Sequence, residues 1–265
     1  MQILFSLPLL VTWGCLLFFG GLSSVAQEIT VSPRTVHVFV ALCDNDNQGI
    51  VPVSKNLGNG QNPKTNLYWG ALYGVKTHFK KSKDWVFIQN VETDNPNILE
   101  RILFKHSKTE TYLLADAYDG RTIYDTTVDF LEASAGNAEQ KIGYGEKELC
   151  FGGGSDLLAY VGHDGLMDFE LRLTLEPANV KKRDAIILAC VSKTFFEPYL
   201  KMAGANPLVW TTGLMSPEAY TLKSALDGWI LGETDALVRE RAAKGYHTYQ
   251  KCGMRGARNL LVTGY

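Results

Sequence analysis

Short runs of hydrophobic residues recur along the chain and mark its expected strands. The run at 35–43 (TVHVFVALC) is rich in β-branched residues and predicts a first strand, which ends in the polar loop DNDNQG. Three further runs, at 156–162, 184–190 and 207–213, are almost uninterrupted. Continuous apolar runs are typical of strands that are covered on both faces of a sheet. These segments therefore predict the centre of a buried sheet.

Segments with helical periodicity alternate with these runs. Helices are expected at 65–80, at 122–136 with Gly136 closing the helix, at 192–204, at 216–232 with Ser216 as the N-cap, and at 233–253. A second strand is expected at 84–90, a β-hairpin at 101–117 and a last strand at 258–264. The alternation predicts an α/β fold, in which a mostly parallel sheet has helices on both faces.

The N-terminal segment has a different composition. Residues 1–26 contain no charged side chain, and small residues at Ser24 and Ala26 precede Gln27. This pattern predicts a signal peptide that is cleaved before Gln27, and hence an exported protein in the periplasm or outside the cell. The apolar run is also long enough to serve as an uncleaved membrane anchor. Residues 27–265 are expected to form one domain.

Composition excludes several classes of protein. The chain has 46% hydrophobic and 20% charged residues, which is typical of a globular domain. The net charge is −2, and no stretch gathers basic residues, so a nucleic acid is not an expected partner. A membrane is expected as a partner only if the N-terminal segment is retained.

Chemically reactive residues follow two of the predicted central strands. His163, Asp164 and Gly165 come directly after the run at 156–162, and the run at 184–190 ends in Cys190. In parallel sheets, ligands bind beyond the carboxyl ends of the strands. An imidazole and a thiol at the same edge form a candidate base and nucleophile.

These two segments, LLAYVGHDG and AIILACVS, resemble the caspase-like cysteine peptidases, a group that includes caspases, metacaspases, legumains, gingipains and separases. The resemblance covers most of 35–265. It implies a three-layer sandwich around a six-stranded sheet, with His after the third strand and Cys after the fourth. The hairpin at 101–117 would then be an insertion. Cys190 follows His163 by only 27 positions, which leaves little room for the helix that the family usually has there.

The resemblance also implies the roles of the site residues. Cys190 would be the nucleophile of an endopeptidase that cleaves a peptide or protein substrate, and His163 would be the general acid and base. A helix beginning near Ser192 would favour the Cys190 thiolate. The N–H of Cys190 and that of Asp164 or Gly165 would bind the oxyanion.

Substrate preference follows from the same resemblance. In related enzymes, loops after the first, fourth and fifth strands form the pocket for the residue before the cleaved bond. Asp44 and Asp46 lie in the first of these loops, and Trp210 begins another. Acidic side chains in that pocket would favour Arg or Lys in the substrate.

Two alternatives remain open at this point. The family has Gly where this chain has Asp164, and a carboxylate there would oppose an oxyanion. This departure favours a catalytically inactive member that binds a peptide or partner. A flavodoxin-like cofactor domain is a third possibility, although the chain has no glycine fingerprint for a nucleotide.

No metal or cofactor is expected. The loop DNDNQG resembles the start of a calcium loop, but Lys55 occupies the position that needs a bidentate Glu. If the first strand lies beside the strand that precedes His163, Cys43 and Cys190 are two strands apart. Neighbouring strands are about 4.8 Å apart, so this separation is about 10 Å, which is too long for a disulfide. Cys190 is therefore expected to be free. Cys150 and Cys252 could pair.

Overall fold

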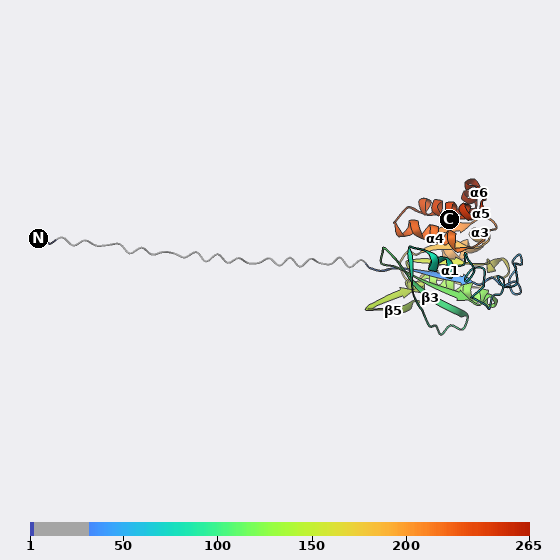
Figure 1. Cartoon of the computed structure of the whole chain (residues 1–265), viewed down its shortest axis with the longest axis horizontal. Coiled ribbons are helices and arrows are strands. Elements are labelled where there is room, and N and C mark those ends of the chain that lie inside the picture. The colour runs from blue at the N-terminus through green and yellow to red at the C-terminus, as the bar shows by residue number, and fades with distance from the viewer. Residues whose placement is uncertain (3–31) are drawn as a thin grey trace. The chain divides into compact units, whose positions relative to one another are not determined.

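An eight-stranded mixed sheet forms the centre of the domain in the computed structural model, which describes residues 1–2 and 32–265 (Figure 1). The predicted signal peptide falls almost entirely outside the described residues. The strand order across the sheet is β10-β9-β8-β7-β1-β4-β3-β2. The strands are β1 (Arg34–Ala41), β2 (Trp85–Asn90), β3 (Ile98–His106), β4 (Thr111–Tyr118), β7 (Leu157–Val161), β8 (Asp184–Leu188), β9 (Asn206–Thr211) and β10 (Leu261–Val262). A separate hairpin consists of β5 (Gln140–Tyr144) and β6 (Lys147–Phe151).

The five central strands run parallel. Strand β1 pairs in parallel with β4 on one side and with β7 on the other, and β7, β8 and β9 continue in the same direction. Strands β3, β2 and β10 extend the sheet at its edges through antiparallel pairs. The chain thus adds strands on one side of β1 first and on the other side later. This reversal of strand order places a crevice at the carboxyl ends of the central strands.

Helices cover both faces of the sheet. The helices are α1 (Val75–Lys81), α2 (Ile123–Ala135), α3 (Ser192–Ala203), α4 (Ala219–Ile230), α5 (Asp235–Gln250) and α6 (Met254–Leu260). Helices α1, α4, α5 and α6 share one hydrophobic core with the sheet, and α2 and α3 share the other. Figure 1 shows α4 and α5 side by side on the same side of the sheet. None of the helices built by the described residues combines the length and apolar character needed to cross a membrane.

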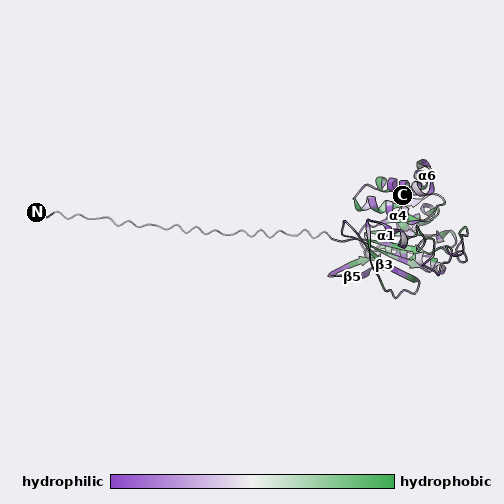
Figure 2. Cartoon of the chain, viewed as in Figure 1, coloured by the Kyte–Doolittle hydropathy of each residue, from purple (hydrophilic) through white to green (hydrophobic). Residues whose placement is uncertain are grey.

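The cores follow from the alternation of side chains along the strands. Val36, Val38 and Val40 of β1 belong to the core under α1 and α4, whereas Phe39 and Ala41 belong to the core under α2 and α3. Because successive side chains of a strand point to opposite faces, a strand buried on both faces is apolar at most of its positions. Figure 2 shows the hydrophobic colour within the sheet and both colours on the outer helices.

The structure confirms the α/β class and the mostly parallel sheet, but the prediction of six strands is wrong. The sheet has eight strands because both strands of the hairpin expected as an insertion, β3 and β4, belong to the sheet. The predicted hairpin exists as β3 and β4, yet its second strand lies beside β1 in the middle of the sheet. The segment at 84–90, expected as the second strand, lies at the edge.

Several predicted helix boundaries also change. The helix expected at 65–80 begins only at Val75, because Gly74 is its N-cap and the Asn66 carbonyl accepts hydrogen bonds from three amides of the preceding turns. The N-cap of α4 is Glu218 and not Ser216. The prediction that α2 ends at Gly136 is confirmed, since Gly136 adopts a left-handed φ of 92°.

Candidate active site

A cleft of about 360 Å³ opens at the carboxyl ends of the central strands. Loops that follow β1, β7, β8 and β9 line it. Its walls are mostly apolar, and His163 and Cys190 are both part of them. The lining residues are Gly49, Ile50, Val51, Val53, Leu67, Tyr68, Gly162, His163, Met167, Cys190, Leu214, Met215, Ser216, Pro217 and Glu218.

The structure brings His163 and Cys190 to the same edge of adjacent parallel strands. Val161 of β7 pairs with Leu188 of β8, and the Gly162 N–H donates to the Leu188 carbonyl at 3.2 Å. His163 and Cys190 each come two residues after this register pair. Since neighbouring strands lie about 4.8 Å apart, the two side chains start from adjacent points on the sheet edge.

A carboxylate that the sequence analysis missed fixes the imidazole. His163 Nε2 lies 2.7 Å from Oδ2 of Asp168, and the Gly49 N–H donates to the same oxygen at 2.9 Å. The Tyr160 hydroxyl donates to the His163 carbonyl at 2.8 Å. Nδ1 of His163 makes no hydrogen bond to another described residue. The imidazole is therefore oriented through Nε2, while Nδ1 remains available for proton transfer.

A short helical turn brings Asp168 back to the histidine. The 3-10 helix Gly165–Met167 follows Asp164, whose side chain accepts a hydrogen bond from the Leu166 N–H at 3.0 Å. This turn reverses the chain and places Asp168 beside the ring. The spacing of five residues in the sequence HDGLMD was the signal that could have identified Asp168, because an Asp N-cap followed by Gly favours a local turn.

The residue that follows Cys190 in the turn after β8 has an unusual backbone conformation. Val191, the next residue, has a left-handed φ of 50°. This region is unfavourable for a β-branched side chain, and such strain concentrates at functional sites. Cys190 Sγ accepts the Met215 N–H at 3.4 Å and lies 3.7 Å from the Met215 carbonyl. The thiol is thus held between the turn after β8 and the loop after β9.

Burial opposes the thiolate that α3 was expected to favour at Cys190. Burial raises the pKa of Cys190, the Met215 N–H lowers it, and the charge of Asp164 raises it further. Helix α3 begins at Ser192 as expected, but the Ser192 N–H donates to the Thr211 hydroxyl at 3.2 Å rather than to the sulfur. The raised pKa therefore favours the thiol over the thiolate at Cys190.

Asp164 lies beneath the site and not in it. Its side chain is fully buried, and Oδ2 has no hydrogen-bond partner among the described residues. Burial raises the pKa of Asp164 to about 7. Of the three residues expected at the oxyanion position, only Cys190 lines the cleft, and neither Asp164 nor Gly165 does. The Cys190 N–H donates to no other described residue, so it is free to bind an oxyanion.

We expect Asp164 to make the stability of the fold depend on pH. Its folded pKa of about 7 exceeds the ordinary value of 3.8, so the unfolded carboxyl loses its proton first as the pH rises. The free energy of unfolding therefore falls between about pH 4 and about pH 7. Asp164→Asn removes this contribution. Melting temperatures of both proteins across this range should converge at low pH and separate in favour of the variant at high pH; parallel curves would contradict the assignment.

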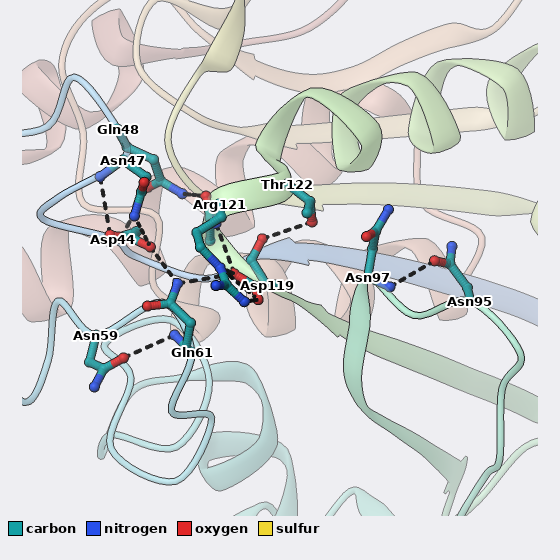
Figure 3. Close-up of polar contacts among 11 residues, drawn as sticks. Asp44, Asn47, Gln48, Asn59, Gln61, Asn95, Asn97, Asp119, Arg121 and Thr122 are labelled. Atoms are coloured by element: carbon teal, nitrogen blue, oxygen red, sulfur yellow. Dashed lines mark hydrogen bonds and ion pairs between the residues drawn. The ribbon is translucent and has the colours of Figure 1, made fainter.

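The three residues expected to bind substrate do not line the cleft. Asp44 is buried, and its carboxylate accepts the Asp46 N–H at 2.9 Å. It also accepts the Gln61 side-chain amide at 2.6 Å, as Figure 3 shows. Asp46 is exposed outside the cleft. Trp210 is fully buried in the core under α2 and α3. The prediction that Trp210 binds substrate is therefore corrected: Trp210 lies on β9 just before the loop, and its side chain points into the core.

The described cysteines are free thiols. Cys43, Cys150, Cys190 and Cys252 form no disulfide with one another, so the expectation for Cys190 is confirmed and the pairing of Cys150 with Cys252 does not occur. Within the described ranges, no three His, Cys, Asp or Glu side chains gather in a way that could hold a metal ion.

Comparison with protein-family models, with curated proteins and with solved structures finds no match to the chain. The function must therefore be argued from the geometry of the cleft.

Proposed function

We propose that the domain is a caspase-like cysteine endopeptidase that cleaves peptide bonds with Cys190 and His163. The observation that carries this proposal is the convergence of the two side chains on one cleft from adjacent parallel strands. Without β2 and β3, the order of strands along the chain places His163 after the third strand of the sheet and Cys190 after the fourth. That is the arrangement expected of the caspase-like fold.

The reaction begins from a neutral thiol. As Cys190 Sγ attacks the carbonyl carbon of the substrate, its proton passes to Nδ1 of His163. The carbonyl oxygen becomes an oxyanion, which the Cys190 N–H is free to bind. The imidazolium is stabilised through Nε2 by the Asp168 carboxylate. Base-assisted attack is required because burial disfavours a thiolate in the resting site.

The second half of the reaction uses the same groups. Imidazolium Nδ1 returns its proton to the departing amine as the carbon–nitrogen bond breaks, which leaves an acyl group on Cys190. A water molecule then gives a proton to His163 and attacks the acyl carbon, and the thiol recovers its proton as the carboxylic acid leaves. The apolar walls around Met167, Leu214 and Met215 provide contacts for an extended substrate.

Hydrolysis of a mixed peptide library by the purified full chain tests this proposal. We expect cleavage that stops when thiols are alkylated. The rival function is an inactive domain that binds peptides in the same cleft, and the neutral, half-buried thiol favours it. Peptide binding with no cleavage at any pH would establish the rival and reject the peptidase.

Asp168 gives the mechanism a more specific test. Asp168→Asn weakens the support of the imidazolium but leaves Cys190 and His163 in place, so we expect a lower kcat with little change in KM. The loss should stay below that of His163→Ala, which removes general acid–base catalysis worth about 10²- to 10⁴-fold. Steady-state kinetics of Asp168→Asn and His163→Ala measures both losses, and Asp46→Asn serves as a matched exposed control. An unchanged kcat in Asp168→Asn would remove Asp168 from the mechanism.

A further inference from the structure

Among the described residues that line the cleft, only Glu218 carries a carboxylate. The other lining residues comprise the apolar walls, two glycines, His163, Cys190, Tyr68 and Ser216, and no Lys or Arg is among them. Glu218 lies at the N-cap of α4, in the loop after β9 that also supplies Leu214 and Met215. A single acidic group in an apolar cleft is the kind of polar feature that fixes the identity of a ligand.

The Glu218 side chain is held in a defined position. Its Oε2 accepts the Tyr220 hydroxyl at 3.0 Å and the Gln250 side-chain amide at 3.4 Å. Tyr220 is itself stacked on Tyr249, with ring centroids 4.2 Å apart and planes within 7° of parallel. The carboxylate is therefore oriented by an aromatic pair from α4 and α5 and does not move freely in solvent.

Glu218 has no positively charged partner among the described residues. Oε1 accepts no hydrogen bond, and no Lys, Arg or His forms an ion pair with this side chain in the part of the chain that the structure describes. Burial raises the pKa of Glu218, and the Tyr220 hydroxyl lowers it. A half-buried carboxylate without a counter-charge is unfavourable, and a cation from a ligand would relieve this cost.

We propose that Glu218 selects peptides that carry an Arg or Lys side chain, by pairing its carboxylate with that cation inside the cleft. That this side chain precedes the cleaved bond rests on the proposed peptidase function. The cation pairing itself depends only on the cleft. The preference for Arg or Lys was expected from Asp44 and Asp46, neither of which lines the cleft. We assign it instead to Glu218, which does.

A binding experiment that needs no catalysis tests the pairing. The full chain with Cys190→Ala is titrated with two peptides that differ only in one side chain, arginine or its neutral isostere citrulline. We expect the arginine peptide to bind at least about 10-fold more tightly, as a charge-assisted hydrogen bond would give. Adding Glu218→Gln, which keeps the hydrogen bond from Tyr220, should reduce this ratio to about one and leave citrulline binding unchanged.

Asp46→Asn is the matched control, since this exposed carboxylate lies outside the cleft and its loss should keep the full preference for arginine. Equal affinity for the two peptides, failure of both to bind, or a preference that survives Glu218→Gln would overturn the proposal. The test of the cation site and the test of peptidase activity can give different results. Binding selectivity without hydrolysis by the unmodified protein supports the cation site alone, whereas hydrolysis without selectivity supports the peptidase alone.

Discussion

Replacement of Cys190 by alanine will abolish peptide hydrolysis while the fold remains intact. The variant has no sulfur to form the acyl intermediate, so we expect the rate to fall by at least about 10³-fold. Cys190 is only half-buried, and its Sγ makes weak contacts with Met215. We therefore expect the free energy of unfolding to change by less than about 1 kcal/mol. Hydrolysis rates and urea denaturation of the same preparations measure both quantities.

Cys252→Ala is the matched control for this experiment. Cys252 is an exposed thiol in the turn before α6 and lies outside the cleft. Its loss should leave the hydrolysis rate unchanged. Residual activity of Cys190→Ala above about a tenth of the original rate would show that another group carries the reaction. A folded variant with full biological activity would instead support the rival function as a binding domain.

The largest effect on stability should come from Asp116, at the centre of a buried ion network. Arg101 donates to both of its carboxylate oxygens at 2.6 Å, and His37 Nε2 lies 2.9 Å from Oδ2. Asp116 and His37 are completely buried. Burial alone would raise the pKa of Asp116, but His37 and Arg101 outweigh it, and the net pKa is lowered. The three groups lie on β1, β3 and β4 and tie these strands together.

Asp116→Ala leaves a guanidinium buried without a counter-charge. We expect the free energy of unfolding to fall by about 3–5 kcal/mol, the typical cost of removing one partner of a buried pair. Glu148→Ala is the control, because Glu148 forms an exposed pair with Lys141 at 2.8 Å whose loss should cost less than about 1 kcal/mol. Denaturant unfolding at neutral pH measures both. Equal costs for the two variants would contradict the structural role of the network.

The sequence was sufficient to predict the central strands because burial on both faces leaves a clear pattern. The runs ending near residues 161 and 188 are continuous and short, and each forms the expected parallel strand. The edges of the sheet were less predictable. Strand β2 lies within one residue of its expected bounds, but only two residues of the strand expected at 258–264 form β10, since α6 extends to Leu260. The β5–β6 hairpin was missed because most of its residues are partly or fully exposed and give little hydrophobic signal.

The site was predictable where it depends on strand ends and unpredictable where it depends on loops. The positions of His163 and Cys190 follow from the register of two buried strands. Glu218 lies seven positions beyond the end of β9 at Thr211, and no periodicity indicates where that loop turns. Asp44 shows the converse error. It follows the apolar run at 35–43 directly, but its carboxylate accepts hydrogen bonds from the amides of its own loop, which a one-dimensional pattern does not reveal.

The most direct test of the account is covalent labelling of the full chain with a peptidyl acyloxymethyl ketone that ends in arginine, followed by mapping of the adduct by mass spectrometry. This reagent alkylates a thiol much faster when the peptide is bound beside that thiol and a base assists. We predict an adduct on Cys190 that His163→Ala slows strongly. An adduct on the exposed Cys252 alone, or labelling of Cys190 at the same rate without His163, would contradict the claim that these two residues form a catalytic pair.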